Sequence, residues 1–341
     1  MTVQYLRQLS LVVAPASGQG LELGALRVVF QTNRGDIQTP NTCDARIYNL
    51  APATARQIAS KQPEFTQLIL KVGYGSAPLA QIFAGSIKQV RVGREDQKNS
   101  YVAITAADGD EAYNFAPVAF ALAKNSTPAN AIQSLIGTMV RNQQALAQSP
   151  SAAVFSSSGQ KITTGYIPPL PKNGSVRGQV FYGSTRDEMR WYCDTFDCKW
   201  SIQNGAITVI PKTGYIPAPA VEISPFTGLI GVPEQTQNGL KVRVLMNSSI
   251  LIGQTIRLNS SINQYRYGLD NQSIPFNRQL AASNVKINPD GLYYVMRAEH
   301  SGDTRGTQWY TDLTCLAVDA TTPLNNVQQA AISPSTAVPR Y

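Results

Sequence analysis

The only histidine of the chain, His300, lies in LYYVMRAEHSGDTRGTQWYTDLT (292–314), three residues before Asp303. A histidine acts as a general base when a nucleophile and an orienting group surround it. The sequence has no G-x-S-x-G elbow, and one histidine cannot form a histidine-based metal cage. The flanking segments have the composition of strands, and SGDTRG between them that of a tight hairpin loop. We therefore predict a structural or interface role for His300, with Asp303 and Arg305 as further candidate interface residues.

Acidic residues gather in DGDEAYNF (108–115), which contains Asp108, Asp110 and Glu111. Two carboxylates on either side of a sugar-binding cleft would serve a glycosidase. This cluster, however, lies where a strand-rich segment passes into a helical one, and acids at the start of a helix are stabilised by the helix dipole. We therefore interpret the cluster as a helix start and predict no catalytic residue and no enzyme activity.

Metal and nucleotide chemistry also lack their usual motifs. Cys193 and Cys198 form a C-x4-C pair, but no second Cys or His pair lies near them to complete a tetrahedral zinc site. Neither G-x-x-x-x-G-K-[ST] nor a strand-borne G-x-G-x-x-G occurs. The sequence therefore predicts no metal and no cofactor, and it predicts four reduced cysteines buried as small apolar groups.

One segment, INQYRYG (262–268), interleaves aromatic and basic residues. Its Tyr265, Arg266 and Tyr267 could stack on the bases of a single strand, but Tyr and Arg are also favoured at protein–protein interfaces. The other basic residues are scattered along the chain although the net charge is +8, which favours a solvated, partner-facing surface over a nucleic-acid site. We take the three residues as candidate interface residues.

Length and composition fit a folded chain of several domains. With 341 residues, of which 43% are hydrophobic, two or three domains with real cores are expected. No apolar run approaches the roughly 20 residues that span a bilayer. The first residues, MTVQYLRQLSLVV, lack the order of a signal peptide. We expect a protein that is made and kept in a cytosol and is not inserted in a membrane.

Strands are predicted in the first and last thirds of the chain. Short segments there are rich in β-branched and aromatic residues and are bounded by Gly, Asn, Asp or Pro. A short helix is expected at 52–60. A longer one is expected at 127–145, where Thr127 is a candidate N-cap and Pro128 takes the first helical position.

The middle of the chain mixes helix and hairpin. Thr185 and Glu188 have the spacing of a capping box at the start of a helix, and Asn204-Gly205 has the preferred chemistry of a two-residue hairpin turn. The fold class is therefore mainly β with an α+β middle, in which two β units flank a small helical and helix-plus-hairpin region. The expected divisions are a first β domain at 1–110, a helical segment and long wrapping linker at 111–176, a helix-plus-hairpin domain at 177–218, a second β domain at 219–319 and a polar tail at 320–341.

Four stretches carry a resemblance to a known family. The segments at 224–258, which begins SPFTGLIGVPEQ, and at 291–318, which contains HSGDTRG, resemble the closing β domain of baseplate hub proteins from contractile-tailed bacteriophages. The segments at 26–59 and 83–116 resemble the first β domain of the same family. The similarity covers most of the chain and keeps the family's order.

The resemblance implies a non-enzymatic part of the virion tail, assembled in the host cytoplasm. It implies two domains of the tail-tube-like β-barrel or sandwich type and a homotrimer, so that three chains form a pseudo-sixfold ring. That ring would join the tail tube, or a tube-initiator protein, to the central spike. Baseplate wedge proteins and a tape measure protein are further expected partners, and DNA is expected only in passage through the central channel.

Three alternatives predict different observations. A hub of a phage-derived injection or secretion machine would share the fold and differ in its neighbouring genes. A tail-tip cell-wall hydrolase would clear peptidoglycan as the purified chain. A nucleic-acid binder would be retained on DNA with an affinity that falls steeply as salt rises.

Overall fold

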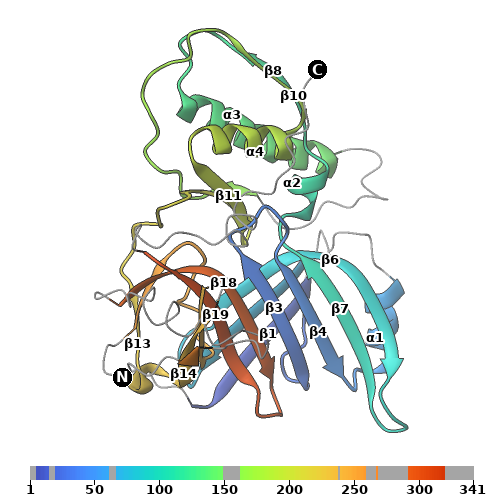
Figure 1. Ribbon diagram of the computed structural model, residues 1–341. Helices are drawn as coiled ribbons and strands as arrows, with labels where there is room; N and C mark the ends of the chain where they lie inside the picture. Colours follow the sequence, from blue (N-terminus) through green and yellow to red (C-terminus); the bar gives the residue numbers. More distant parts are fainter. Residues whose placement is uncertain are drawn as a thin grey trace, which may run out of the picture.

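A computed structural model of the protein describes residues 5–14, 20–60, 67–148, 162–236, 239–258, 266–267 and 291–318. Within these ranges most strands join one curled sheet of 14 strands, and a smaller module of helices and short sheets lies above it in Figure 1. The predicted mainly β fold class is confirmed.

The first β unit alternates buried and exposed side chains along each strand, which places one face of the sheet on a core. A 15-residue strand, β6, carries a bulge between Ile87 and Gln89 that helps the sheet to curl. The predicted helix at 52–60 is confirmed as α1 (Pro52–Ser60). The strands are β1 (Arg7–Ala14), β2 (Leu21–Glu22), β3 (Val28–Gly35), β4 (Thr42–Tyr48), β5 (Gln67–Tyr74), β6 (Ala80–Arg94) and β7 (Ser100–Ala107).

The second β unit has its own core, built from alternate residues of its strands together with Ile250 and Ile252. A short 3-10 helix, η2 (Pro225–Thr227), precedes β14. The strands are β13 (Val221–Ile223), β14 (Leu229–Thr236), β15 (Gly239–Leu245), β16 (Thr255–Leu258), β17 (Arg266–Tyr267), β18 (Leu292–Asp303) and β19 (Trp309–Ala317).

A third core belongs to the middle of the chain, which we call the peripheral module (residues 110–211). Its helices pack on a three-stranded sheet and a two-stranded ribbon, and Trp200 stacks on Tyr113 at a centroid distance of 5.2 Å inside that core. The elements are α2 (Asp110–Asn114), β8 (Pro117–Leu122), α3 (Pro128–Gln148), β9 (Thr163–Thr164), β10 (Gln179–Ser184), α4 (Thr185–Thr195), β11 (Cys198–Gln203) and β12 (Ala206–Pro211).

Local signals in the module are mostly confirmed. The amide of Asn130 bonds the Thr127 hydroxyl at 3.3 Å, as a cap requires, and the Asn204-Gly205 turn has φ angles of 52° and 81°. The predicted capping box is wrong. The N-cap is Ser184 and makes no side-chain cap bond, because the Thr185 hydroxyl donates to the Ala116 carbonyl at 2.6 Å.

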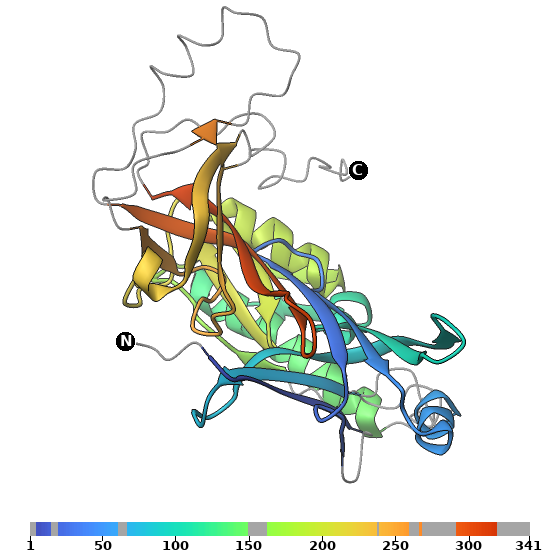
Figure 2. The same cartoon turned by 90° about the horizontal axis from the view of Figure 1, so that it is seen from below.

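The two β units are one sheet because β18 pairs with strands of both. Its first half pairs with β16 of the second unit, and its second half pairs with β3 of the first unit from Arg297↔Gly35 to Asp303↔Val29. A bulge at Met296 separates the two halves. Figure 2 shows the β18–β19 hairpin beside β3. We call this β3–β18 pairing the seam.

The tip of the same hairpin is part of the first unit's core. Trp309 is 1% exposed and meets Phe30 edge to face at 5.7 Å, and Met246 at the end of β15 joins the same cluster. A Cβ added at Gly302 would lie 2.6 Å from the Phe30 ring and 2.9 Å from Trp309. The absence of a side chain at this position therefore lets the two aromatic rings meet across the seam.

Gly302→Ala should lower the free energy of unfolding by about 1–3 kcal/mol, because the added methyl overpacks two buried rings. Urea unfolding of the full-length protein measures the effect. The control is Gly137→Ala in α3, where an added Cβ meets nothing within 4 Å, and a gain of about 0.5–1 kcal/mol is expected from helix propensity. Equal effects of the two substitutions would contradict the packing account.

Candidate assembly site

His300 lies in the buried layer of the seam. It is 1% exposed, faces Thr32 on β3 and Thr311 on β19, and its Nδ1 is 2.9 Å from the Thr311 hydroxyl. Burial, with a smaller effect from the Arg34 guanidinium, lowers the pKa of His300 from 6.5 to about 3. The imidazole is therefore neutral at ordinary pH and packs inside the chain, where a partner cannot meet it while the fold is intact.

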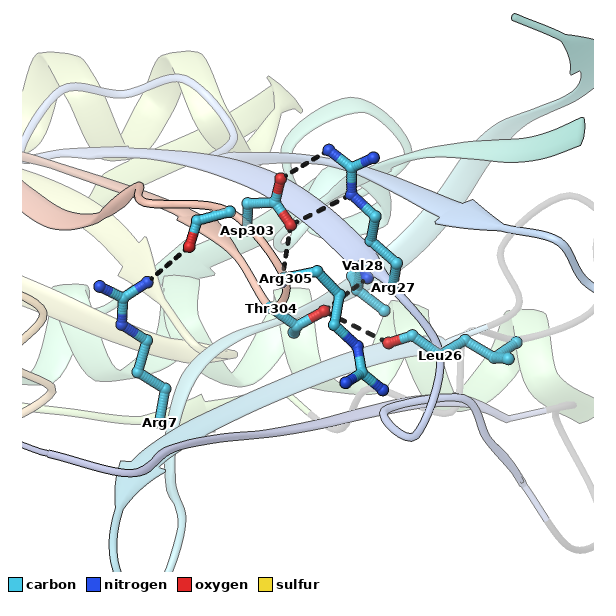
Figure 3. A network of polar contacts seen from close by, with 8 residues as sticks. Arg7, Leu26, Arg27, Val28, Asp303, Thr304 and Arg305 are labelled. Atoms are coloured by element: carbon cyan, nitrogen blue, oxygen red, sulfur yellow. Dashed lines mark hydrogen bonds and ion pairs between the residues drawn. The ribbon is translucent and has the colours of Figure 1, made fainter. Parts of the chain in front are cut away.

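Asp303 begins the hairpin turn and ties it to the first β unit. Its carboxylate accepts from Arg27 Nη2 at 2.8 Å and Nε at 3.3 Å, and from the backbone N–H of Arg305 at 2.9 Å (Figure 3). The Arg27 guanidinium, held also 4.8 Å over the ring of Tyr48, lowers the pKa of Asp303 together with these backbone bonds. Asp303 is 7% exposed, so its main role in the structure is to anchor the turn.

Two further contacts dock the same turn. The Thr304 amide donates to the Val28 carbonyl at 3.0 Å, while the Thr304 hydroxyl accepts from the Val28 amide at 2.9 Å. Arg7 on β1 donates to the Gly306 and Thr307 carbonyls at 2.9 and 3.3 Å. Figure 3 shows contacts that reach the turn from Arg7 of β1 and from residues 26–28 at the start of β3. The GDTRG motif is thus a clasp between segments almost 300 residues apart.

The other candidate interface residues are in two places. Arg305, at the tip of the clasp, is exposed. Arg266 and Tyr267 form β17, whose backbone pairs in parallel with Glu234 and Gln235 at the opposite margin of the second unit. Tyr265 lies outside the described residues. The structure therefore brings His300, Asp303 and Arg305 together in one hairpin and places Arg266 and Tyr267 away from it.

One face of the joined sheet is polar without a break at the seam. The strand registers set Ser301 of β18 beside Gln31 of β3, then Asp44 of β4, Thr105 of β7 and Gln89 of β6. All five are exposed or half-buried. We call this surface, which continues onto β19 and β15, the polar face.

Charges on the polar face are largely paired in the second unit. Arg243 donates to Asp312 across β15 and β19 at 2.6 and 3.0 Å, and Arg297 lies 2.5 Å from Glu299. In the first unit Arg46 and Arg91 line a hollow of about 550 Å³. The polar face thus offers water-exposed hydrogen-bonding groups with a small excess of positive charge.

A buried carboxylate joins all three parts of the chain. Asp36, in the loop after β3, pairs with the Lys199 ammonium of β11 and accepts from the Tyr294 hydroxyl of β18 at 2.6 Å. The Lys199 Nζ also lies 4.5 Å from the centroid of the Tyr294 ring. Burial, followed by the Asp36 charge, raises the pKa of Tyr294 well above 10. The three residues are at most 7% exposed, so this junction holds the peripheral module on both β units.

A second polar cluster supports the junction. Asp108 accepts the backbone N–H groups of Asn204 and Gly205 at 2.6 and 3.0 Å. The Asn41 amide donates to Asp108 at 3.3 Å and to Gln203 at 3.1 Å. The predicted helix start at the acidic cluster is confirmed as α2, but Asp108 itself holds the β11–β12 turn against the first β unit.

The cysteines and carboxylates of the described residues form no metal site. The four cysteines are free and buried, as predicted, and burial raises the pKa of each thiol. Among the described residues no group of three or more His, Cys, Asp or Glu side chains could hold a metal ion. In the same part of the chain no helix is long and apolar enough to cross a membrane.

No protein-family model matches the sequence, and no curated protein matches it. Among solved structures the chain is similar to the tail protein from Neisseria meningitidis MC58, with a TM-score of 0.52 and 9% identity over 91% of this chain and 96% of that chain. It is also similar to the 43 kDa tail protein of prophage MuSo2 from Shewanella oneidensis, with a TM-score of 0.53 and 7% identity over 92% and 99%. The chain therefore has the fold of these tail proteins, as the resemblance to baseplate hub proteins implies.

Stability should fall on acidification because of His300. Its folded pKa of about 3 lies below the ordinary 6.5, so between these values the unfolded chain binds a proton that the folded chain excludes. The free energy of unfolding should drop by up to about 1.4 kcal/mol per pH unit in this window. Urea unfolding measured between about pH 7 and about pH 5 tests this. His300→Gln should flatten the slope; an unchanged slope would contradict the assignment.

The Asp36 junction should show strong coupling. Lys199→Met leaves a buried carboxylate without its cation and should cost about 3–5 kcal/mol, whereas the double variant Asp36→Asn, Lys199→Met should recover part of that loss. A double-mutant cycle from urea unfolding gives the coupling. Arg243→Met, which breaks an ion pair with exposed partners, is the matched control and should cost about 1 kcal/mol or less. Similar losses for Lys199 and Arg243 would rule out the buried junction.

Proposed function

We propose that the protein is the structural hub of a contractile phage tail baseplate, a homotrimeric ring that adapts a hexameric tail tube to a trimeric central spike. The observation that supports this most is the seam, which fixes two β units of one chain in a single sheet. The likeness in fold to tail proteins supports a place in the tail. On this proposal the protein is part of the virion and is assembled in the host cytoplasm.

Symmetry gives the physical reason for two β units. A threefold ring of chains that each present two similar β units offers six units to the tube and keeps three equivalent positions for the spike. This adaptation needs the two units of a chain at a fixed angle. Three features oppose independent movement of the two units. They are the seam, the ion pair of Asp303 with Arg27, and the Asp36 junction.

The polar face is the surface that we assign to the channel of the ring. Its row of Ser301, Gln31 and Asp44 crosses the seam and would give a hydrated wall across both units. Some cations of this face are paired with carboxylates, as Arg243 is with Asp312. Fewer cations are therefore available to bind DNA phosphates, so DNA would pass without tight binding. In this role the protein is not an enzyme.

Partners would meet the margins of the ring. The tube or tube-initiator protein, the spike, wedge proteins and the tape measure protein are the proposed partners. We assign Arg305 at the exposed tip of the clasp, and Arg266 and Tyr267 at the margin of the second unit, to such contacts. Tyr265, which lies outside the described residues, is proposed for the same role from the sequence. A hub of a phage-derived injection or secretion machine would use the same geometry, and the genes beside this one would distinguish the two settings.

The purified full-length protein should form a trimer, so its mass should be three times the 36.9 kDa of one chain. If it trimerises only with the spike protein encoded beside it, the complex should contain three copies of this chain. Light scattering after size-exclusion chromatography measures this mass. Retention on duplex DNA at physiological salt should be weak. A chain that stays monomeric with and without the spike protein would contradict the proposal, and so would clearing of peptidoglycan by the purified chain.

A further inference from the structure

The ribbon of β8 and β10 has an inner and an outer face. Phe120 and Phe181 point to the module's core, where their rings are 5.0 Å apart, and Phe181 also meets Tyr192 of α4. On the opposite side, the register sets Val180 beside Ala121 and Tyr182 beside Ala119. Figure 1 shows the ribbon at the end of the molecule farthest from the joined sheet. We call the surface of Ala119, Ala121, Val180 and Tyr182 the ribbon face.

The ribbon face is apolar yet faces water in the isolated chain. Val180 is 74% exposed and Tyr182 79% exposed, and Val176 at the end of the ribbon is 82% exposed. A strand with one face on a core normally places polar residues on the other face. No other element of the described chain pairs with either strand. The two large exposed apolar side chains on the paired ribbon, Val180 and Tyr182, with Val176 just before β10, mark a contact surface.

The end of the ribbon is basic. Lys124, Lys172 and Arg177 are exposed in the two segments that meet there, and residues 112–186 contain no Asp or Glu. Two backbone hydrogen bonds tie these segments together. The Asn125 amide donates to the Ser175 carbonyl at 2.9 Å, and the Ser175 amide donates to the Ser126 carbonyl at 3.0 Å. The cations therefore extend from a backbone that is already ordered, next to the apolar patch.

We propose that the ribbon face docks an acidic protein, one that presents an apolar patch flanked by Asp or Glu side chains. Charge complementarity favours such a partner, since the exposed Lys124, Lys172 and Arg177 at the end of the ribbon would repel a basic surface. A nucleic acid fits less well, because Tyr182 is the only aromatic ring on the face and Val176 and Val180 give bases nothing to stack on. The proposal takes its candidate partners from the proposed function, since they are other proteins of the same tail.

Tyr182 is the anchor of this surface. Tyr is enriched among the few residues that carry most of the energy of an interface, and its neighbour across the ribbon, Ala119, leaves its ring accessible. The two paired strands fix the backbone before binding, which lowers the entropy lost on association. Lys124 and Lys172 would contribute mainly to the rate of association and to its dependence on salt.

The test titrates each purified tail protein encoded beside this chain against the full-length protein. We expect one acidic partner to bind, with its affinity weakened about tenfold or more by Tyr182→Ala. Lys124→Ala with Lys172→Ala should weaken binding less and reduce its dependence on salt. Phe226→Ala is the matched control, because Phe226 is an aromatic residue 87% exposed outside the ribbon, and it should leave binding unchanged.

Several results would overturn the proposal. One is an equal effect of Tyr182→Ala and Phe226→Ala on the binding affinity. Another is that none of the tail proteins binds. A third is that Tyr182→Ala weakens binding only to duplex DNA or to anionic phospholipid vesicles. Loss of the trimer in Tyr182→Ala would assign the ribbon face to contacts between copies and would also overturn it. The mass of the unmodified protein tests the proposed hub independently, so the two failures are distinguishable.

Discussion

The backbone pairing of β3 with β18 is the constraint on which the rest of the structure depends. Seven consecutive register pairs, from Arg297↔Gly35 to Asp303↔Val29, join strands that are more than 250 residues apart in the sequence. This pairing makes one sheet of two β units. It also brings the tip of the β18–β19 hairpin into the first unit's core, where Trp309 meets Phe30. Without the seam, neither a continuous polar face nor a fixed angle between the units would exist.

Polar groups at the seam are buried at a cost, and most of them are paired. Arg34 donates to the Ile82 carbonyl and to Gln203, and Asp36 is held by Lys199 and Tyr294. Buried charges that are hydrogen-bonded or ion-paired in this way favour one arrangement, because any other leaves a charge without partners in a medium of low polarity. The polar contacts therefore select how the three parts fit together, while the three hydrophobic cores stabilise each part.

The two surfaces that we assign to function differ in chemistry and in position. The polar face crosses the seam, consists of water-exposed polar groups and pairs charges internally in the second unit, which suits a channel wall. The ribbon face lies on the peripheral module, is apolar and has a basic end, which suits a protein partner. The Asp36 junction lies between the module and the β units, so it would fix the direction in which the ribbon face points relative to the ring.

The sequence by itself determined the mainly β class, the helices at 52–60 and near 127–145, and the Asn204-Gly205 hairpin, because each follows from local periodicity, capping and turn chemistry. It also identified the HSGDTRG hairpin as the informative segment. Only the tertiary structure decided that His300 is buried, that Thr185 bonds Ala116 in place of a capping box, and that Asp36, Lys199 and Tyr294 meet. Asp36 and Tyr294 are 258 residues apart and meet because β3 and β18 pair at the seam, whereas Thr185 and Ala116 meet inside the peripheral module across 69 residues. No local pattern encodes either contact.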